Sequence, residues 1–184
     1  GAEFLDVGAN MGLYSIYAAR FRNARVTAFE PEAQNFALLN RNIACNGLGD
    51  QITAYGVAIS DQPGFAPLYV RGLEAAGAFH SFAENVDDNL QPAAVSLKQG
   101  CYGTTLDTLL ADQVIVQPQY IKIDVDGLEH KVIRGAQRTL KQVRSVLVEM
   151  NANLVEHNEA IAALEALGLE REHVAAHQRG AVTN

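Results

Sequence analysis

The feature that most constrains the fold of this chain is an alternation of short apolar segments with amphipathic helical segments. Apolar runs at Ala2–Val7, Val26–Phe29 and Tyr120–Val125 are each followed by apolar residues at helical spacing. Strands that are apolar along their whole length are typical of a parallel sheet covered by helices on both faces. The sequence therefore predicts an α/β fold built on a mainly parallel sheet.

The remaining predicted elements complete this alternation. Further core strands are predicted over Ile52–Ile59 and Val146–Met150, and apolar residues at every fourth position predict one continuous helix over Leu128–Leu140. Two more extended runs, at Phe65–Val70 and Ala93–Lys98, flank a stretch rich in Gly, Asn and Asp. Because loops often carry binding residues, we expect this stretch to form a loop near the active site.

Size, composition and charge limit the class of protein. The 184 residues show no compositional shift or internal repeat, so we expect one domain over residues 1–184. A formal net charge of −7 disfavours binding to nucleic acid or to an anionic membrane surface and favours a small neutral or cationic substrate. The sequence lacks an apolar run of ~20 residues and a signal peptide. We therefore expect a cytoplasmic protein in which Cys45 and Cys101 are reduced.

The loop after the first predicted strand has the composition of a ligand-binding turn. Its sequence DVGANMG contains Gly8, Asn10 and Gly12, a spacing that departs from the G-x-G-x-x-G pattern of dinucleotide sites. Asp6 would repel a pyrophosphate, whereas a carboxylate suits a ligand with ammonium and sulfonium groups, as in S-adenosyl-L-methionine. The alternative is an ordinary strand-to-helix turn capped by Asn10.

A second acidic residue follows the second predicted strand. Glu30 lies 24 residues after Asp6 (30 − 6), close to the separation expected of an acid that accepts hydrogen bonds from a ribose. An ionised carboxylate suits this task because it can accept hydrogen bonds from both ribose hydroxyls. The alternative is an acid that stabilises the N-terminus of the next helix, a position that fits Glu32 better than Glu30.

Several segments, in their order along the chain, closely resemble the FkbM-type family of methyltransferases. The resemblance covers nearly the whole chain from Asp6 to Asn151, which makes it far more specific than a single glycine motif. The matching segments are DVGANMGLYSIYAA, FEPEAQNFALLNRNI, AISDQPG, TTLDTLL, IKIDVDGLEHKVIRGA and VLVEMN.

This resemblance implies a Rossmann-like class I methyltransferase fold and S-adenosyl-L-methionine as cofactor. It also implies transfer of a methyl group to a hydroxyl oxygen of a sugar or a secondary metabolite. The residues it assigns to the cofactor are Gly8, Asn10 and Gly12 at the methionine end, Glu30 at the ribose, and the segment Ala58–Asp61, including both end residues, beside the adenine.

Two acids close the fourth core strand and are candidates for catalysis. Alternate strand residues point to the same face, so we expect Asp124 and Asp126 to face the cleft together. One of them could take a raised pKa and act as general base, or both could bind the cofactor's ammonium group and a substrate donor. The alternative makes Asp126 the N-cap of the following helix, with Glu129 completing a capping box.

Other polar residues give weaker predictions. His80 and Ser81 lie in the polar stretch where we expect substrate contacts, and His80 is a candidate general base, with a solvated loop histidine as the alternative. A divalent cation held by Asp124, Glu149 and Asn151 is a minority interpretation, and the sequence predicts no metal site. No chemical role is assigned to the other histidines, His130 in a predicted helix and His157, His173 and His177 in a polar tail.

Two other functions remain open at this stage. A nicotinamide-dependent oxidoreductase shares the alternating architecture, although the glycine spacing disfavours it. A non-catalytic domain that binds a partner could keep the same fold, although the acids at Asp6, Glu30 and Asp124 disfavour it. No segment precedes the first strand where helices of the family cover the cofactor, so we expect an N-terminal piece to be missing. The oligomeric state is left open, and loop residues around Leu73–Asn89 are expected to select the acceptor.

Overall fold

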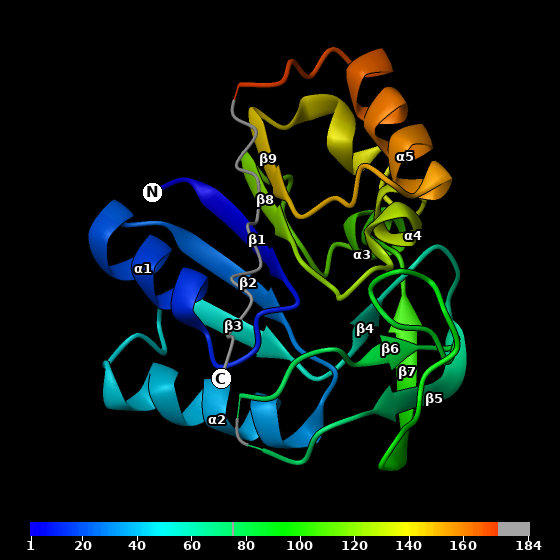
Figure 1. Cartoon of the computed structure of the whole chain (residues 1–184). Coiled ribbons are helices and arrows are strands. Elements are labelled where there is room, and N and C mark those ends of the chain that lie inside the picture. The colour runs from blue at the N-terminus through cyan, green and yellow to red at the C-terminus, as the bar shows by residue number, and fades with distance from the viewer. Residues whose placement is uncertain (75, 173–184) are drawn as a thin grey trace, which may run out of the picture.

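The computed structural model describes residues 1–74 and 76–172, which form two sheets with helices around them (Figure 1). The larger sheet contains β1 (Glu3–Val7), β2 (Arg25–Phe29), β3 (Ile52–Tyr55), β8 (Tyr120–Ile123) and β9 (Ser145–Val148). Its strand order is β3-β2-β1-β8-β9, and every neighbouring pair is parallel. The predicted α/β fold with a parallel sheet is therefore confirmed.

Helices cover both faces of this sheet. Because successive strand side chains point to opposite faces, Phe4 packs with the cluster that contains Leu39 of α2 (Ala33–Cys45), whereas Leu5 belongs to the cluster that contains Val132 of α4 (Glu129–Arg134). Among the described residues, no helix is both long and apolar enough to cross a bilayer. The helices are α1 (Leu13–Arg22), α2 (Ala33–Cys45), α3 (Leu106–Ala111), α4 (Glu129–Arg134) and α5 (Val155–Ala166).

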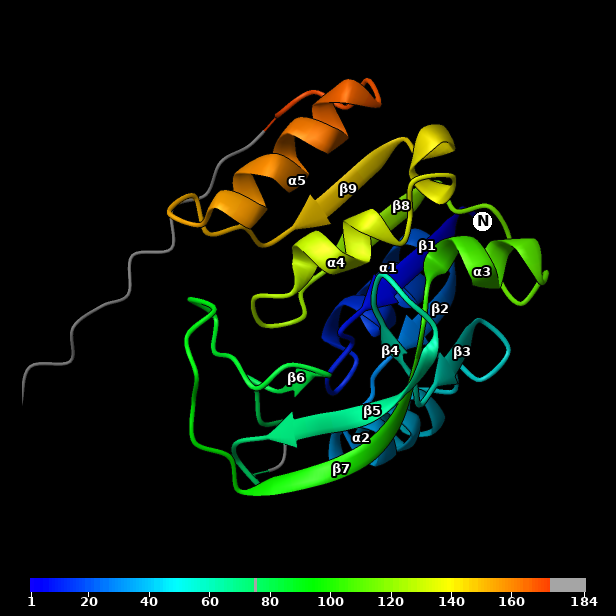
Figure 2. The same cartoon turned by 90° about the vertical axis from the view of Figure 1, so that its right-hand side faces the viewer.

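A smaller sheet stands beside the carboxyl ends of the parallel strands (Figure 2). Its strands, in spatial order, are β4 (Ala58–Ile59), β7 (Leu97–Thr104), β5 (Gly64–Val70) and β6 (Ser81–Phe82). The long antiparallel pair of β5 and β7 runs from Gly64 opposite Gly103 to Val70 opposite Leu97. All four strands come from the chain between β3 and β8, so this sheet forms one side of the site described below.

Two strand predictions were wrong in their boundaries. The predicted strand Ile52–Ile59 is divided at Gly56, so its first half is β3 in the large sheet and its end is β4 in the small one. The ring of Phe36 lies only 3.4 Å from the position that a Cβ of residue 56 would take. The strand predicted over Ala93–Lys98 begins instead at Leu97. Its polar residues form a strand because they pair with β5, which periodicity alone does not reveal.

The predicted helix over Leu128–Leu140 is also interrupted. It consists of α4, which ends at Arg134, and a short 3-10 helix at Thr139–Gln142. A Cβ at Gly135 would lie 2.2 Å from the carbonyl oxygen of Ser60, so only glycine fits the contact with the small sheet. The Asp107 carboxylate accepts hydrogen bonds from the amides of Arg138 and Thr139, which replaces helical bonding at this point.

Candidate active site

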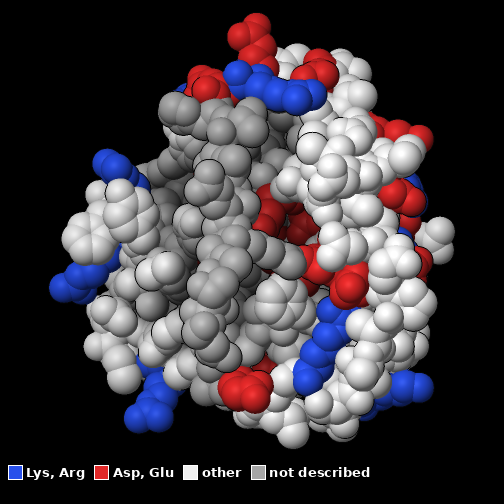
Figure 3. All heavy atoms as spheres, viewed as in Figure 1, with Lys and Arg blue, Asp and Glu red and all other residues white. Residues whose placement is uncertain are grey.

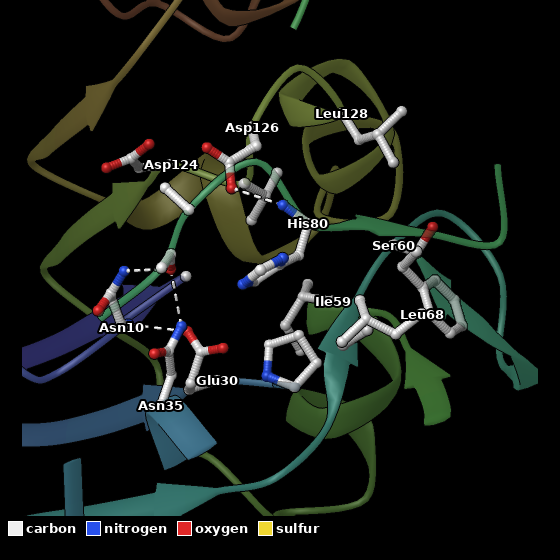
Figure 4. A pocket seen from close by; sticks show the side chains of 17 residues that line it. Asn10, Glu30, Asn35, Ile59, Ser60, Leu68, His80, Asp124, Asp126 and Leu128 are labelled. Carbon is white, nitrogen blue, oxygen red and sulfur yellow. Dashed lines mark hydrogen bonds between the residues drawn. The ribbon is translucent and has the colours of Figure 1, made fainter. Parts of the chain in front are cut away.

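A cavity lies where the carboxyl ends of β1, β2 and β8 meet the small sheet (Figure 4). Figure 4 shows Asn10, Asn35 and Glu30 on one side of it, Asp124 and Asp126 on another, and His80 between them. Of the residues predicted from the sequence, the cavity is lined by Gly8, Asn10, Glu30, Ala58, His80, Asp124 and Asp126. It is not lined by Asp6, Gly12 or Asp61.

The loop after β1 turns sharply through residues with left-handed backbone angles. Gly8 has φ 74° and Gly12 has φ 92°, and Asn10 tolerates φ 50°. A Cβ at Gly8 would lie 1.8 Å from the carbonyl oxygen of Asp124, so glycine is required by the approach of β8. A Cβ at Gly12 would lie 2.5 Å from Leu39, which packs beneath the loop. Gly8 therefore allows the ends of β1 and β8 to lie close together at the wall of the cavity.

Glu30 is buried and faces the cavity at the end of β2. Its Oε2 accepts a hydrogen bond from the Asn10 amide at 2.8 Å, and its Oε1 accepts one from the Glu32 amide at 2.9 Å. Burial raises the pKa of Glu30 from 4.5 to about 7, against the opposing effect of these two bonds. Glu32 takes the capping role, since its Oε2 accepts from the Asn35 amide at 2.7 Å.

Asp6 lies beneath the loop rather than in the cavity. Its carboxylate is wholly buried and accepts a hydrogen bond from Ser15 Oγ at 2.6 Å. Lys122 Nζ lies 3.5 Å from its other oxygen. Burial raises the pKa of Asp6, and the charge of Lys122 partly opposes this rise. The structure thus surrounds Asp6 with partners from α1 and β8 instead of placing it against a ligand.

Asp124 and Asp126 both line the cavity, but Asp126 lies in a left-handed turn beyond the strand, with φ 57°. Its Oδ2 accepts from the amides of Phe79 at 2.7 Å and His80 at 3.2 Å. Burial, and next the charge of Asp124, raises the pKa of Asp126 from 3.8 to about 7. The capping alternative is wrong, because Leu128 is the N-cap residue of α4 and Asp126 bonds elsewhere.

The segment Gly77–His80 lies across the cavity. The carbonyl oxygen of Gly77 accepts hydrogen bonds from Asn10 Nδ2 at 3.1 Å and from Asn35 Nδ2 at 2.9 Å. His80 is half-buried, and burial lowers its pKa below 6.5, which favours a neutral imidazole at neutral pH. The space that remains is about 120 Å³, whereas small-ligand sites enclose about 300 Å³ or more. We therefore expect this segment to move outward when a nucleoside binds.

At the far end of the cavity, only part of the predicted adenine segment lines the wall. Ala58, Ile59 and Ser60 line it, whereas the carboxylate of Asp61 binds Arg134 Nη1 at 3.0 Å. The apolar side chains of Leu68 and Phe82 from the small sheet complete this end. This end of the cavity is therefore lined mainly by apolar side chains.

Sequence reasoning missed two buried groups beside the site. Lys122 is a charged residue in the middle of an apolar strand, and that anomaly was the available signal. His157 was placed in a polar tail without a role, but it is buried in α5, where its Nδ1 accepts from the Asn151 amide at 3.0 Å. Its Nε2 then donates to the carbonyl oxygen of Gly127 at 2.9 Å, beside Asp126. His173 and His177 lie outside the described residues.

The structure gives no support to a metal held by Asp124, Glu149 and Asn151. Among residues 1–74 and 76–172, no group of three or more His, Cys, Asp or Glu side chains could hold a metal ion. The Asn151 side chain donates to Asn89 Oδ1 at 3.1 Å.

The charges around the cavity select between cofactors. Glu30, Asp124 and Asp126 line it, and within the described part of the chain no Lys or Arg does so. Figure 3 shows acidic side chains in the hollow of this face. A pyrophosphate would meet carboxylates and no Lys or Arg side chain in the described lining, whereas a sulfonium and an ammonium would be attracted. The acidic lining of the cavity therefore fits S-adenosyl-L-methionine and disfavours a dinucleotide.

A parallel sheet of this order, with a cavity at its carboxyl edge, defines a Rossmann-like α/β fold. The chain belongs to the family described as the methyltransferase FkbM domain, which matches residues 6–170. Members of this family are methyltransferases that use S-adenosyl-L-methionine. The resemblance predicted from the sequence is confirmed.

Individual relatives are distant. The chain is 27% identical over 172 residues to methyltransferase sdnD of Sordaria araneosa, covering 79% of this chain and 64% of that protein. It is 27% identical over 152 residues to the hexuronic acid methyltransferase AglP of Haloferax volcanii, covering 81% of this chain and 56% of that protein. The crystal structure of methyltransferase FkbM from Methylobacillus flagellatus KT superposes with a TM-score of 0.57 at 16% identity, covering 89% and 37%. The chain thus spans less than two thirds of each of these proteins.

Proposed function

We propose that this chain catalyses methyl transfer from S-adenosyl-L-methionine to a hydroxyl oxygen of a sugar or another small metabolite. The observation that carries the proposal is the buried carboxylate of Glu30, which faces a cavity lined by acids at the carboxyl ends of β1, β2 and β8. The name of the relative AglP, a hexuronic acid methyltransferase, supports a carbohydrate acceptor. In this proposal residues 1–184 act as one domain, because both sheets contribute walls to the cavity.

Each end of the cofactor has a proposed binding region. Glu30 accepts hydrogen bonds from the ribose hydroxyls, and Ala58–Ser60 lie beside the adenine. Gly8 and Asn10 line the methionine end, where the carboxylate of Asp124 binds the ammonium group. Gly12 shapes the loop from beneath, and Asp6 acts through its neighbours. Because the Asp61 carboxylate binds Arg134, any effect of Asp61 on the adenine is indirect.

The bound cofactor supplies a methyl group activated by its sulfonium. The protein then has to align the acceptor oxygen and remove its proton. Asp126 is suited to receive that proton, because its carboxylate lines the cavity and its pKa of about 7 matches neutral conditions. His80 is the second candidate base, because its neutral imidazole also lines the cavity.

Calorimetric titration of the protein with S-adenosyl-L-methionine and, separately, with NAD tests the proposal. We expect heat of binding with the first ligand and none with the second. Binding of NAD alone would identify an oxidoreductase, and binding of neither would favour a domain that only contacts a partner. A screen of sugars and small hydroxyl compounds with methyl-labelled cofactor then identifies the acceptor, and absence of transfer to any hydroxyl would contradict O-methylation.

A further inference from the structure

Lys122 lies at the junction of three elements of the site. It occupies the middle of β8 directly opposite Asp6 of β1 and is 4% exposed. Its Nζ lies 2.6 Å from the carbonyl oxygen of Gly8, 3.3 Å from Asp124 Oδ2 and 3.5 Å from Asp6 Oδ1. One ammonium group therefore contacts the β1 acid, the glycine loop and the β8 acid.

The energetic cost of burying this charge makes its contacts informative. A buried ammonium group is strongly destabilising unless carboxylates and hydrogen-bond acceptors surround it. One carboxylate would balance its charge, and Asp6, which is wholly buried, could do so alone. Lys122 Nζ also reaches the Val7 carbonyl oxygen and the Tyr14 ring, and two further contacts, with the Gly8 carbonyl and the Asp124 carboxylate, belong to residues that line the cavity. Charge compensation of Asp6 does not explain these two contacts.

The negative charge around Lys122 is unevenly exposed to the cavity. With both acids ionised, two carboxylates and one ammonium group carry one net negative charge. Asp6 is closed off from solvent, whereas the side chain of Asp124 is 40% exposed and lines the cavity. The excess negative charge is therefore available on the cavity side, where it would attract a ligand's ammonium group.

We propose that Lys122 is a positioning residue for the methionine end of the cofactor. By holding the Gly8 carbonyl and the Asp124 carboxylate at fixed separation, it pre-organises the wall that binds the ammonium group without touching the cofactor itself. This inference rests on the proposed function, because it assumes that S-adenosyl-L-methionine occupies the cavity. It extends that function to a side chain that lies outside the cavity lining.

The test separates this role from charge compensation. Replacing Lys122 alone would leave Asp6 buried without a cation, so the comparison is made between Asp6→Asn and the double variant Asp6→Asn/Lys122→Met. Both lack the buried carboxylate and differ only in the ammonium group. Thermal unfolding checks that both are folded. If the Met variant does not fold, Lys122→Gln replaces it in the same background, since its side chain is shorter and carries no charge.

Affinity is measured by calorimetry for two ligands, S-adenosyl-L-methionine and 5′-methylthioadenosine, which lacks the amino-acid portion. We expect the double variant to bind S-adenosyl-L-methionine about tenfold or more weakly than Asp6→Asn, and 5′-methylthioadenosine within about twofold. Equal weakening for both ligands would show a merely structural role. Unchanged affinity, or tighter binding caused by the unpaired charge of Asp124, would show that Lys122 does not position the wall. Each of these results overturns the inference. If the unaltered protein binds neither ligand, the proposed function itself fails.

Discussion

The backbone amide of Asn10 donates a hydrogen bond to Glu30 Oε2 at 2.8 Å, so the acid that ends β2 also fixes the loop that follows β1. The amide of Glu32 donates to the other carboxylate oxygen at 2.9 Å. Each oxygen has a second lone pair and can still accept from a ligand hydroxyl. Glu30 therefore links two strand ends and presents an acceptor to the cavity at the same time.

Glu30→Ala is expected to weaken the binding of S-adenosyl-L-methionine by about 1 to 3 kcal/mol, because charge-assisted hydrogen bonds to the ribose are lost. Calorimetric titration measures the effect. Glu159→Ala is the matched control, because it removes an exposed glutamate from α5, away from the cavity lining. Unchanged affinity in Glu30→Ala would remove Glu30 from the cofactor site.

The raised pKa of Glu30 predicts a dependence of stability on pH. The folded state holds a proton on Glu30 up to about pH 7, whereas the unfolded chain releases it near the ordinary pKa of 4.5. This contribution to stability is present below pH 4.5 and is lost as the pH rises through about 7. Between pH 5 and about 8, the free energy of unfolding should fall by about 1 to 3 kcal/mol more in the unaltered protein than in Glu30→Gln.

Urea unfolding of both proteins across this pH range measures the difference. The comparison uses the change with pH, because the Glu30→Gln substitution also removes one backbone hydrogen bond at every pH. Asp126 titrates in the same window and contributes to the pH profile of both proteins, and its charge is one of the causes that raise the pKa of Glu30. Parallel pH profiles for the two proteins would show that Glu30 does not carry a raised pKa.

Asp126 is expected to control the segment that lies across the cavity. In Asp126→Ala the amides of Phe79 and His80 lose their acceptor, so their hydrogen exchange should accelerate by about tenfold. Asp87→Ala is the control, because its carboxylate accepts from Asn89 and Gln91 in the neighbouring loop. Added S-adenosyl-L-methionine should accelerate the same two amides in the unaltered protein, because the segment has to move. Slower exchange on binding would contradict that movement.

The parts of the fold that the sequence predicted are those in which local pattern and tertiary packing agree. Val26–Phe29 forms a strand of the buried sheet, and its apolar run is visible without knowledge of its neighbours. β7 was misplaced because its Gly, Lys and Gln residues form a strand only when paired with β5. The small sheet therefore depends on contacts between distant segments, which no window of the sequence contains.

In the site, too, features that depend on local sequence were predicted and features that depend on distant contacts were not. Gly8 and Glu30 were found because a turn and a strand end leave a sequence signal, and both line the cavity. The environment of Asp6 could not be predicted, because Ser15 and Lys122 reach it from two other elements. Asp126 was assigned a side-chain direction from strand alternation, but the chain leaves the strand at Ile123 and turns. Spacing locates a residue along the chain, and partners from elsewhere decide its chemistry.

Glu129 is expected to stabilise the turn that presents Asp126. Its Oε1 accepts hydrogen bonds from the amides of Val125 at 2.9 Å and Gly127 at 3.2 Å, and the side chain is 2% exposed. Glu129→Ala leaves both amides without an acceptor inside the protein, which should cost about 2 to 4 kcal/mol of unfolding free energy. Glu129→Gln keeps an oxygen in the same place and should cost about 1 kcal/mol or less.

Comparing Glu129→Ala with Glu129→Gln separates the effect of the hydrogen-bond acceptor from the effect of the charge. Burial raises the pKa of Glu129, so a neutral amide removes a desolvation penalty along with any attraction to His157, whose Nε2 lies 3.5 Å from Oε2. Urea unfolding near pH 7 gives both free energies, and exchange at the Val125 and Gly127 amides reports on the turn directly. Equal destabilisation in the two variants would show that the charge near His157, rather than the acceptor, holds the turn. A stable Glu129→Ala protein with protected amides would show that the turn forms without this side chain.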